Sequence, residues 1–191
     1  MTAAAPVRSI ASWSRLTDDG RQFLAVAMVV VVGLAAGLGL KLVSENQTRN
    51  VTAGGVTAGT PRSWIYQSGA GDLLFSVRDP LHPGLQYSVS LVASGSDLAR
   101  VVDNQVRAKS GILNDFQQLS REPAASAGRT GQAVTYAYVV TREGRAPAVI
   151  QGRDLYLPAA GSVLVISLQS PIATFDDALP GFNRFADSVR S

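Results

Sequence analysis

The chain contains no cysteine and a single histidine, His82, among its 191 residues. The absence of cysteine excludes disulfide bonds, thiolate metal sites and thiol chemistry together. A lone histidine excludes most sites that need several imidazoles. Asp79 lies three residues before His82, but these two side chains are too few ligands for a closed metal site. We therefore expect no metal site and no other cofactor.

The sequence also lacks the short motifs of common catalytic sites. It contains no G-x-S-x-G sequence, and the glycine-rich residues 54–59 are not followed by the Lys-Ser/Thr pair of a phosphate-binding loop. Asp176 and Asp177 resemble a carboxylate pair, but Thr174 precedes Asp177 by three residues, which is a helix-start signal. We interpret these carboxylates as helix-capping residues and predict that the protein is not an enzyme.

A cationic cluster of the kind that binds nucleic acid is missing. The chain has a formal net charge of +3, but residues 62–191 carry 12 Lys and Arg against 11 Asp and Glu. Binding by phosphate neutralisation needs cations gathered on one face, and no such run is visible. We expect no nucleic-acid partner.

The most distinctive feature that is present is an uncharged stretch at residues 23–40, FLAVAMVVVVGLAAGLGL. As an α-helix it would be about 27 Å long, close to the roughly 30 Å hydrocarbon core of a bilayer. Leu42 and Val43 extend it beyond Lys41, so we predict a transmembrane helix over residues 23–43. A cleaved signal peptide or a buried core helix fits less well, because the stretch is long and no small-x-small cleavage site follows.

The charges beside this stretch predict its orientation. Three arginines, at positions 8, 15 and 21, precede it, whereas Lys41 and Arg49 follow it. The positive-inside rule then predicts a cytoplasmic tail over residues 1–22 and an extracytoplasmic C-terminal domain. The tail itself fits either a short interfacial helix around Trp13 or a disordered segment. We expect a single-pass protein of a cell membrane or a photosynthetic membrane, in contact with lipid.

Small residues in the predicted span indicate a helix-packing surface. Gly33, Ala36 and Gly37 belong to a G-x-x-x-G sequence, which lets a second helix approach closely. Ordinary composition is the alternative, since Gly and Ala are common in membrane helices. After the span, residues 44–61 are polar and rich in Gly and Thr, and we interpret them as a flexible linker.

Residues 62–191 alternate between strand and helix patterns. Short apolar or alternating runs predict strands at residues 73–77, 87–92, 134–140, 149–157 and 163–168, with another near Phe116. One amphipathic helix is predicted to begin at Ser96 or Asp97 and end near Gly111. A second is expected at the C-terminus with Pro180 in its first turn. The predicted fold class is α+β, with five or six strands in a mainly antiparallel sheet.

The order of these features resembles the PsbP-like group and the related Mog-type Ran-binding proteins. The matching sequences are LLFSV before Asp79-Pro80, YSVSLV, the helix from Leu98, GQAVTYAYVV, GRDLYL, VLVISL and the final FNRFADSVR. The resemblance implies an α/β/α sandwich whose members bind and stabilise other proteins and do not act as enzymes. It does not carry over a photosystem role or an ion site, because the predicted membrane span is absent from photosystem II PsbP.

These features together predict a membrane-anchored accessory or assembly protein. Its extracytoplasmic domain would bind and stabilise a larger membrane complex, photosynthetic or respiratory, whose integral subunits are the expected partners. Arg142, Arg145 and Arg153 are candidates for a docking patch near a hairpin. The tyrosines Tyr136, Tyr138 and Tyr156 are interpreted as packing residues of the sheet.

Two other functions stay open. A module that binds a small ligand or a lipid would place a pocket between the sheet and a helix, lined by Val101, Val102, Phe182 and Phe185. An enzyme that uses carboxylates such as Asp79 and Asp154 is the third hypothesis.

Overall fold

The computed structural model describes residues 28–34, 47–93, 97–141, 143–144 and 146–191, and the chain divides into two compact units, residues 1–47 and 48–191. In the first unit, residues 28–34 are helical and exposed. The remainder of the predicted span over residues 23–43 lies outside the described residues, as does the tail over residues 1–22. Within the described ranges, no helix combines the length and the apolar character needed to cross a membrane.

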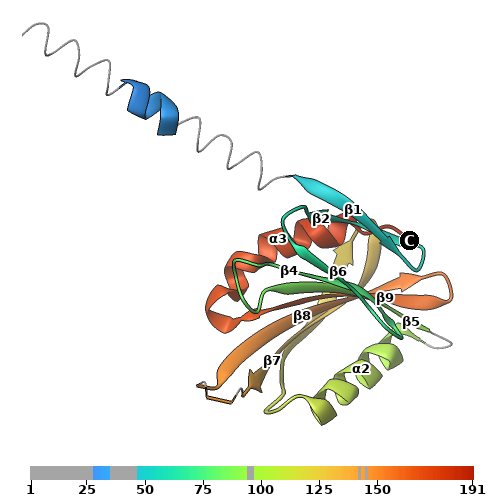
Figure 1. The fold of residues 1–191 in the computed structure, drawn as a ribbon. Helices are drawn as coiled ribbons and strands as arrows, with labels where there is room; N and C mark the ends of the chain where they lie inside the picture. The colour runs from blue at the N-terminus through green and yellow to red at the C-terminus, as the bar shows by residue number, and fades with distance from the viewer. Residues whose placement is uncertain (1–27, 35–46, 94–96, 142, 145) are drawn as a thin grey trace, which may run out of the picture. The chain divides into compact units, whose positions relative to one another are not determined.

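The second unit is built around a seven-stranded sheet with the order β3-β4-β5-β9-β8-β7-β6 (Figure 1). Every neighbouring pair in it is antiparallel, which confirms the predicted mainly antiparallel architecture. The strands are β3 (Ile65–Ser68), β4 (Leu73–Arg78), β5 (Gln86–Ala93), β6 (Gln117–Ser126), β7 (Arg129–Val140), β8 (Ala148–Ala159) and β9 (Ser162–Pro171).

The sheet is wider than the five or six strands expected, because the edge strand β3 was not predicted; the strand expected near Phe116 corresponds to the other edge strand, β6, which begins at Gln117. Both edge strands have weak sequence signals. The four residues of β3 are all exposed, and β6 is mostly exposed and polar. Edge strands carry charges and proline to discourage further pairing, as β6 does with Arg121, Glu122 and Pro123. Such strands show little of the alternation that marks a half-buried strand.

Two helices cover opposite faces of the sheet, α2 (Leu98–Ile112) and α3 (Phe175–Ser188) (Figure 1). Because side chains alternate along a strand, β9 contributes to both cores. Leu164 and Ile166 pack on the α3 side, whereas Val163 and Val165 pack on the α2 side. The apolar residues on both faces of β9 are therefore explained by its central, doubly covered position.

The C-terminal helix begins earlier than predicted. A 3-10 turn, η1 (Ile172–Thr174), leads directly into α3 at Phe175, so Pro180 lies inside the helix and not in its first turn. Thr174 occupies the N-cap position as expected, but its hydroxyl bonds to the Pro171 carbonyl and makes no capping bond. Asp176 and Asp177 lie in the first turn, where carboxylates stabilise the positive end of the helix dipole.

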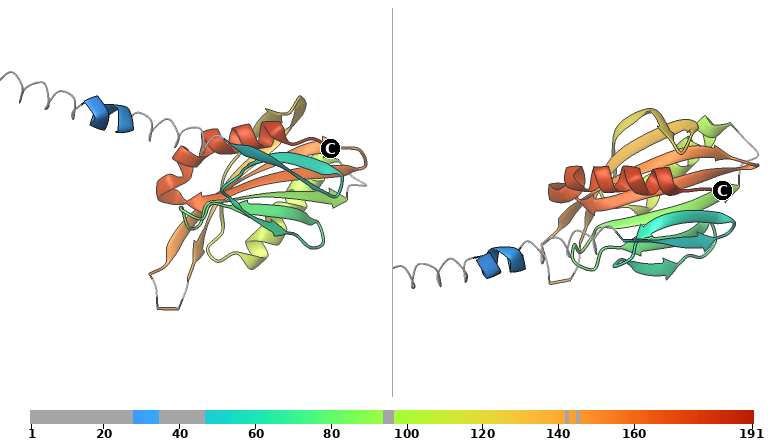
Figure 2. Two further views of the ribbon diagram at one scale, coloured as in Figure 1. Left: turned by 45° about the horizontal axis from the view of Figure 1, so that its top comes forward. Right: turned by 90° about the horizontal axis from the view of Figure 1, so that it is seen from above.

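The prediction of a flexible linker over residues 44–61 was wrong for residues 48–61. These residues form a β-hairpin, β1 (Thr48–Ala53) and β2 (Val56–Pro61), on the α3 side of the sheet (Figure 2). Gly54 and Gly55 make the turn with φ of +57° and +79°, which suits a two-residue hairpin loop. Val56 is buried in the α3 core, so burial of apolar surface explains why the segment is ordered.

Candidate functional site

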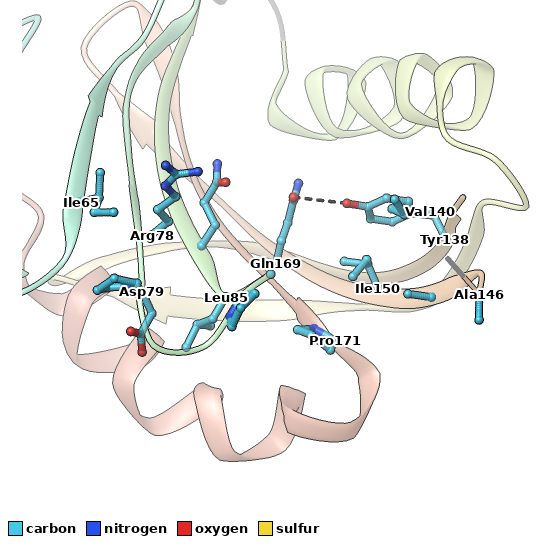
Figure 3. A pocket seen from close by; sticks show the side chains of 15 residues that line it. Ile65, Arg78, Asp79, Leu85, Tyr138, Val140, Ala146, Ile150, Gln169 and Pro171 are labelled. Atoms are coloured by element: carbon cyan, nitrogen blue, oxygen red, sulfur yellow. Dashed lines mark hydrogen bonds between the residues drawn. The ribbon is translucent and has the colours of Figure 1, made fainter. Parts of the chain in front are cut away.

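An open groove of about 570 Å³ lies on the α2 face of the sheet, at one end of its strands (Figure 3). The groove extends over six strands, from β3 to β7, and no residue of α2 lines it. Arg78 ends β4, Gln86 begins β5 and Pro171 ends β9, so these strand ends place their side chains at the same edge. The antiparallel order of the sheet is what brings these distant segments together.

Strand alternation decides which side chains enter the groove. Val77 of β4 and Leu168 of β9 are buried in the α3 core. Their neighbours Arg78 and Gln169 therefore project from the opposite face, into the groove. The same alternation turns Gln86 into the groove and Tyr87 into the α3 core.

Three polar side chains form one row across the groove floor. Arg78 is opposite Gln86 in the β4–β5 pairing, and Gln86 is opposite Gln169 in the β5–β9 pairing. The Tyr138 hydroxyl donates to the Gln169 carbonyl oxygen at 3.3 Å, which Figure 3 marks at the centre of the groove. The row joins a guanidinium to two amides in a site that is open to solvent.

Apolar side chains flank this polar row on both sides. Ile65 of the edge strand β3 stands at one end of the groove and is 43% exposed. Val140, Ala148 and Ile150 of the β7–β8 hairpin stand at the other end (Figure 3 labels Val140 and Ile150). A few polar groups between apolar walls are typical of a binding site, because the walls supply burial and the polar groups fix orientation.

The Asp79–His82 pair lies in the loop between β4 and β5. One Asp79 oxygen accepts from the Leu81 backbone N–H at 2.8 Å, and the other lies 2.7 Å from His82 Nδ1. These contacts fix the turn that forms one end of the groove. Across the part of the chain that the structure describes, no three side chains among His, Cys, Asp and Glu gather as a metal site would require.

A second polar cluster is buried beneath α2. Lys109, from the last turn of α2, donates to Asp154 at 2.5 Å and to the Tyr136 hydroxyl at 2.8 Å. The Tyr156 hydroxyl donates to the same carboxylate at 2.9 Å. Asp154 is fully buried, so its charge depends on these partners. We call these four residues the Lys109 cluster; its geometry attaches the end of α2 to β7 and β8.

The tyrosines of the Lys109 cluster are held in their neutral form. Burial and, after it, the negative charge of Asp154 raise the pKa of Tyr136 well above its ordinary value of 10.0. The same two causes raise the pKa of Tyr156. Both hydroxyls therefore keep their protons and act as hydrogen-bond donors to the carboxylate. Tyr136, Tyr138 and Tyr156 pack in the sheet as expected, but they also have these polar roles.

The residues predicted from sequence as contact sites are only partly described. Gly33 lies in the helical residues 28–34, and a Cβ added there would meet no other part of the described chain within 4 Å beyond its own turn of helix. Ala36, Gly37, Arg142 and Arg145 lie outside the described residues.

Arg153 is described, and its guanidinium already has partners. It donates to Glu122 of β6 at 2.8 Å and to the Thr135 hydroxyl of β7 at 3.5 Å. Arg153 lies five residues after Ala148, where β8 begins at the β7–β8 hairpin, and is therefore about 17 Å along the strand from that turn. The docking patch of Arg142, Arg145 and Arg153 stays a prediction.

The ligand pocket proposed from sequence between the sheet and a helix does not form from the residues named for it. Val101 and Val102 are buried on the α2 side of the sheet, whereas Phe182 and Phe185 are buried on the α3 side, so they do not share a pocket. The two carboxylates of the enzymatic hypothesis have different partners as well. Asp79 pairs with His82 in a loop, and Asp154 pairs with Lys109 beneath α2.

Sequence reasoning missed Lys109 and the row of Arg78, Gln86 and Gln169. Lys109 had a usable signal, because it continues the apolar stripe of Val102 and Val106 at helical spacing. A cation in that stripe predicts a buried counter-ion. The row had no such signal, since its residues align only once the order β4-β5-β9 is known.

Solved structures with a similar fold include cyanobacterial PsbP, CyanoP, of Synechocystis sp. PCC 6803. It is 15% identical, with a TM-score of 0.53, and the match covers 75% of this chain and 91% of that one. The Saccharomyces cerevisiae Ran-binding protein Mog1p is 12% identical, with a TM-score of 0.47 and coverage of 75% and 95%. LpqN, involved in cell envelope biogenesis of Mycobacterium tuberculosis, is 16% identical, with a TM-score of 0.47 and coverage of 75% and 89%.

The domain therefore has a PsbP-like α+β fold. At these identities the likeness concerns the fold alone. No protein-family model and no curated protein sequence matches the chain.

Proposed function

We propose that this chain is a membrane-anchored accessory protein whose PsbP-like domain binds a subunit of a larger membrane complex, photosynthetic or respiratory. The observation that carries the proposal is the groove across β3 to β7, where apolar walls flank a row of polar side chains. The coarser function, an accessory or binding module, agrees with the PsbP-like fold.

The partners of the carboxylates favour binding over catalysis. Asp154 is engaged by Lys109 and Tyr156, and Asp79 by His82 and a backbone N–H. A general base needs a carboxylate or imidazole within reach of a substrate. At the centre of the groove are a guanidinium and two amides, and the one carboxylate among its described lining residues, Asp79, is already engaged by His82 and the Leu81 N–H.

The uncharged residues 23–40 supply the anchor in this proposal. Membrane attachment raises the effective concentration of the domain near membrane partners, so a docking site of modest affinity is sufficient. The arginines before the span support a cytoplasmic N-terminus, with the domain on the other side of the membrane. Arg49, which follows the span, donates to the Trp64 carbonyl at 3.0 Å and so belongs to the domain.

The span also contributes a contact surface in this proposal. Gly33, Ala36 and Gly37 would let a partner helix approach closely. The double variant Gly33→Leu/Gly37→Leu is expected to insert normally and to associate less with the complex. If the variant and the parent chain co-purify equally well with the complex, the span is only an anchor and the partner contacts lie in the domain.

Gentle detergent extraction followed by native electrophoresis tests the proposal. The full chain is expected to migrate with a complex much larger than its own 20.0 kDa. A chain without residues 1–43 but with the hairpin β1–β2 intact is the comparison that measures the contribution of the anchor. Migration of the full chain only as a monomer would contradict the proposal.

A second candidate function is a module that binds a small ligand. The groove volume of about 570 Å³ favours it, because small-molecule sites usually measure about 300–1,000 Å³. The two functions differ in what binds the chain in a fixed ratio, a small molecule or a protein subunit. Mass spectrometry of the purified full chain under native conditions would show a bound small molecule in one case and a protein subunit in the other.

A further inference from the structure

We propose that the groove recognises a carboxylate on an extended segment of a partner polypeptide, flanked by apolar side chains. Arg78, Gln86 and Gln169 would bind the carboxylate, and the apolar walls would bind its neighbours. This inference rests on the proposed function and specifies the partner's chemistry.

The register of the sheet places the three side chains within reach of one anionic group. Arg78 and Gln86 are directly opposite, as are Gln86 and Gln169. Side chains opposite each other on neighbouring strands have Cβ atoms about 4.5–5.5 Å apart. A guanidinium and two amides at this spacing can donate several hydrogen bonds to one carboxylate.

The donors of this row are available. Among the described residues, the Arg78 guanidinium and the Gln86 amide have no hydrogen-bond or ion-pair partner. The Gln169 carbonyl oxygen accepts from Tyr138, and one N–H of its amide is directed at the Tyr136 hydroxyl, which leaves the second N–H of Gln169 to bind an acceptor. Tyr138 thereby fixes which end of the Gln169 amide is used for recognition.

The nearest carboxylate does not neutralise Arg78. Asp79 is the next residue, but Figure 3 shows the two side chains directed away from each other. Both Asp79 oxygens have partners, the Leu81 N–H and His82. Asp79 lines the same groove, but its oxygens are engaged, so the Arg78 guanidinium is the charged group left to bind a ligand, and charge complementarity favours an anionic one.

The length of the groove favours a polypeptide over a small organic acid. The groove is lined by residues of six neighbouring strands, β3 to β7 in sheet order. Strands lie about 4.8 Å apart, so five spacings correspond to about 24 Å. An extended polypeptide covers that distance with about seven residues, at about 3.3 Å for each residue.

The apolar side chains lie where the neighbours of the central acid would contact them. Ile65 lies on the outer strand β3, beyond Arg78, with which it is paired in register. Val140 and Ile150 lie on the far side of Gln169. An acidic residue bound at the centre would thus place apolar neighbours on each side against Ile65 and the β7–β8 hairpin.

Selection from a random octapeptide display library tests the inference. The target is the full chain in lipid nanodiscs, compared with its variants Arg78→Gln and Arg100→Gln. Arg100 is an exposed residue of α2 outside the groove, so Arg100→Gln removes the same charge as a control. Peptides with a central Asp or Glu and apolar neighbours are expected from the parent chain and from Arg100→Gln, but not from Arg78→Gln.

A double-mutant cycle then tests the contact itself. The best selected peptide is compared with its Asp→Asn or Glu→Gln counterpart by fluorescence anisotropy. The acidic peptide is expected to bind the parent chain about tenfold more tightly than its amide counterpart, and both are expected to bind Arg78→Gln equally. Circular dichroism of Arg78→Gln is expected to match the parent, because the side chain is exposed.

Three outcomes of the peptide experiments would each overturn the inference: a library that gives no binder, selected peptides without an acidic preference, or an acidic preference that survives Arg78→Gln. Hexanoate is the small-molecule comparison. Displacement of the selected peptide by hexanoate at a similar concentration would assign the groove to small acids and would also overturn it. Association of the full chain with a large complex is measured separately on native gels. A negative result in the peptide experiments together with a positive native gel would therefore reject the carboxylate inference and leave the proposed function standing.

Discussion

Replacing Asp154 by alanine is expected to destabilise the domain strongly. The carboxylate is fully buried and accepts hydrogen bonds from Lys109 Nζ at 2.5 Å and from the Tyr156 hydroxyl at 2.9 Å. Asp154→Ala leaves the ammonium without its counter-ion and the buried hydroxyl without an acceptor. Both losses weaken the attachment of α2 to the sheet.

The size of the effect follows from these two losses. Removing one partner of a buried ion pair costs about 3–5 kcal/mol. The Lys109 side chain is 21% exposed, so its ammonium can turn toward water and the cost falls near about 3 kcal/mol. The Tyr156 hydroxyl, left buried without a hydrogen-bond acceptor, adds about 1 kcal/mol or more to this loss of stability. A total of about 4 kcal/mol would lower Tm by about 8–16 °C for a domain of this size.

Urea unfolding of the full chain in detergent, followed by far-UV circular dichroism, measures this loss. Asp154→Asn keeps the shape and an acceptor oxygen, so it is expected to unfold at a urea concentration between those of the parent and Asp154→Ala. The double variant Lys109→Met/Asp154→Leu removes both charges and is expected to be more stable than Asp154→Ala. An unfolding free energy for Asp154→Ala within about 1 kcal/mol of the parent would refute the structural role of the Lys109 cluster.

Three further substitutions or conditions test other parts of the fold. Val56→Ala is expected to cost about 2 kcal/mol in urea unfolding, because Val56 is buried in the α3 core; no loss would mean that the hairpin β1–β2 does not pack there. Gly152→Ala would place its Cβ 2.3 Å from the Tyr136 ring and is expected to cost about 1–3 kcal/mol, measured in the same way. Burial, outweighing the nearby Arg184, raises the pKa of Tyr87 from 10.0 to about 12. The folded state holds this proton more tightly than the unfolded state, so the contribution of Tyr87 to the free energy of unfolding is fully present below pH 10. It is expected to fall by about 2–3 kcal/mol as the pH rises to 12. The variant Tyr87→Phe, which has no proton to lose, should show a smaller fall.

The doubly covered centre of the fold could be predicted from sequence, but the edge strand β3 and the hairpin β1–β2 could not. The apolar run at residues 163–168 fits only a central strand, and the stripe of Val102 and Val106 fits a helix against the sheet. The hairpin β1–β2 was mistaken for a linker because its strands are short, mostly polar and rich in Thr, with few large apolar residues. The Gly54-Gly55 pair between two Val-Thr sequences was the signal for its turn.

The candidate site depends on long-range register, which a single sequence does not contain. Gln86 and Gln169 are separated by most of the domain in sequence and lie opposite each other only because β5 pairs with β9. Strand alternation alone predicts that Arg78 and Gln169 face away from their apolar neighbours. It does not predict that they share a groove. Lys109, by contrast, could have been identified from its place on the apolar stripe of α2.

Site-specific photo-cross-linking is the measurement that tests the central claim most directly. A photoreactive amino acid replaces Ile65 in the groove of the full chain, or replaces Ile112, which is 78% exposed and lies outside the groove. Irradiation in intact membranes is expected to give a discrete protein adduct at position 65 that is lost with Arg78→Gln and absent at position 112. No adduct at position 65, or the same adducts at both positions, would contradict docking through the groove.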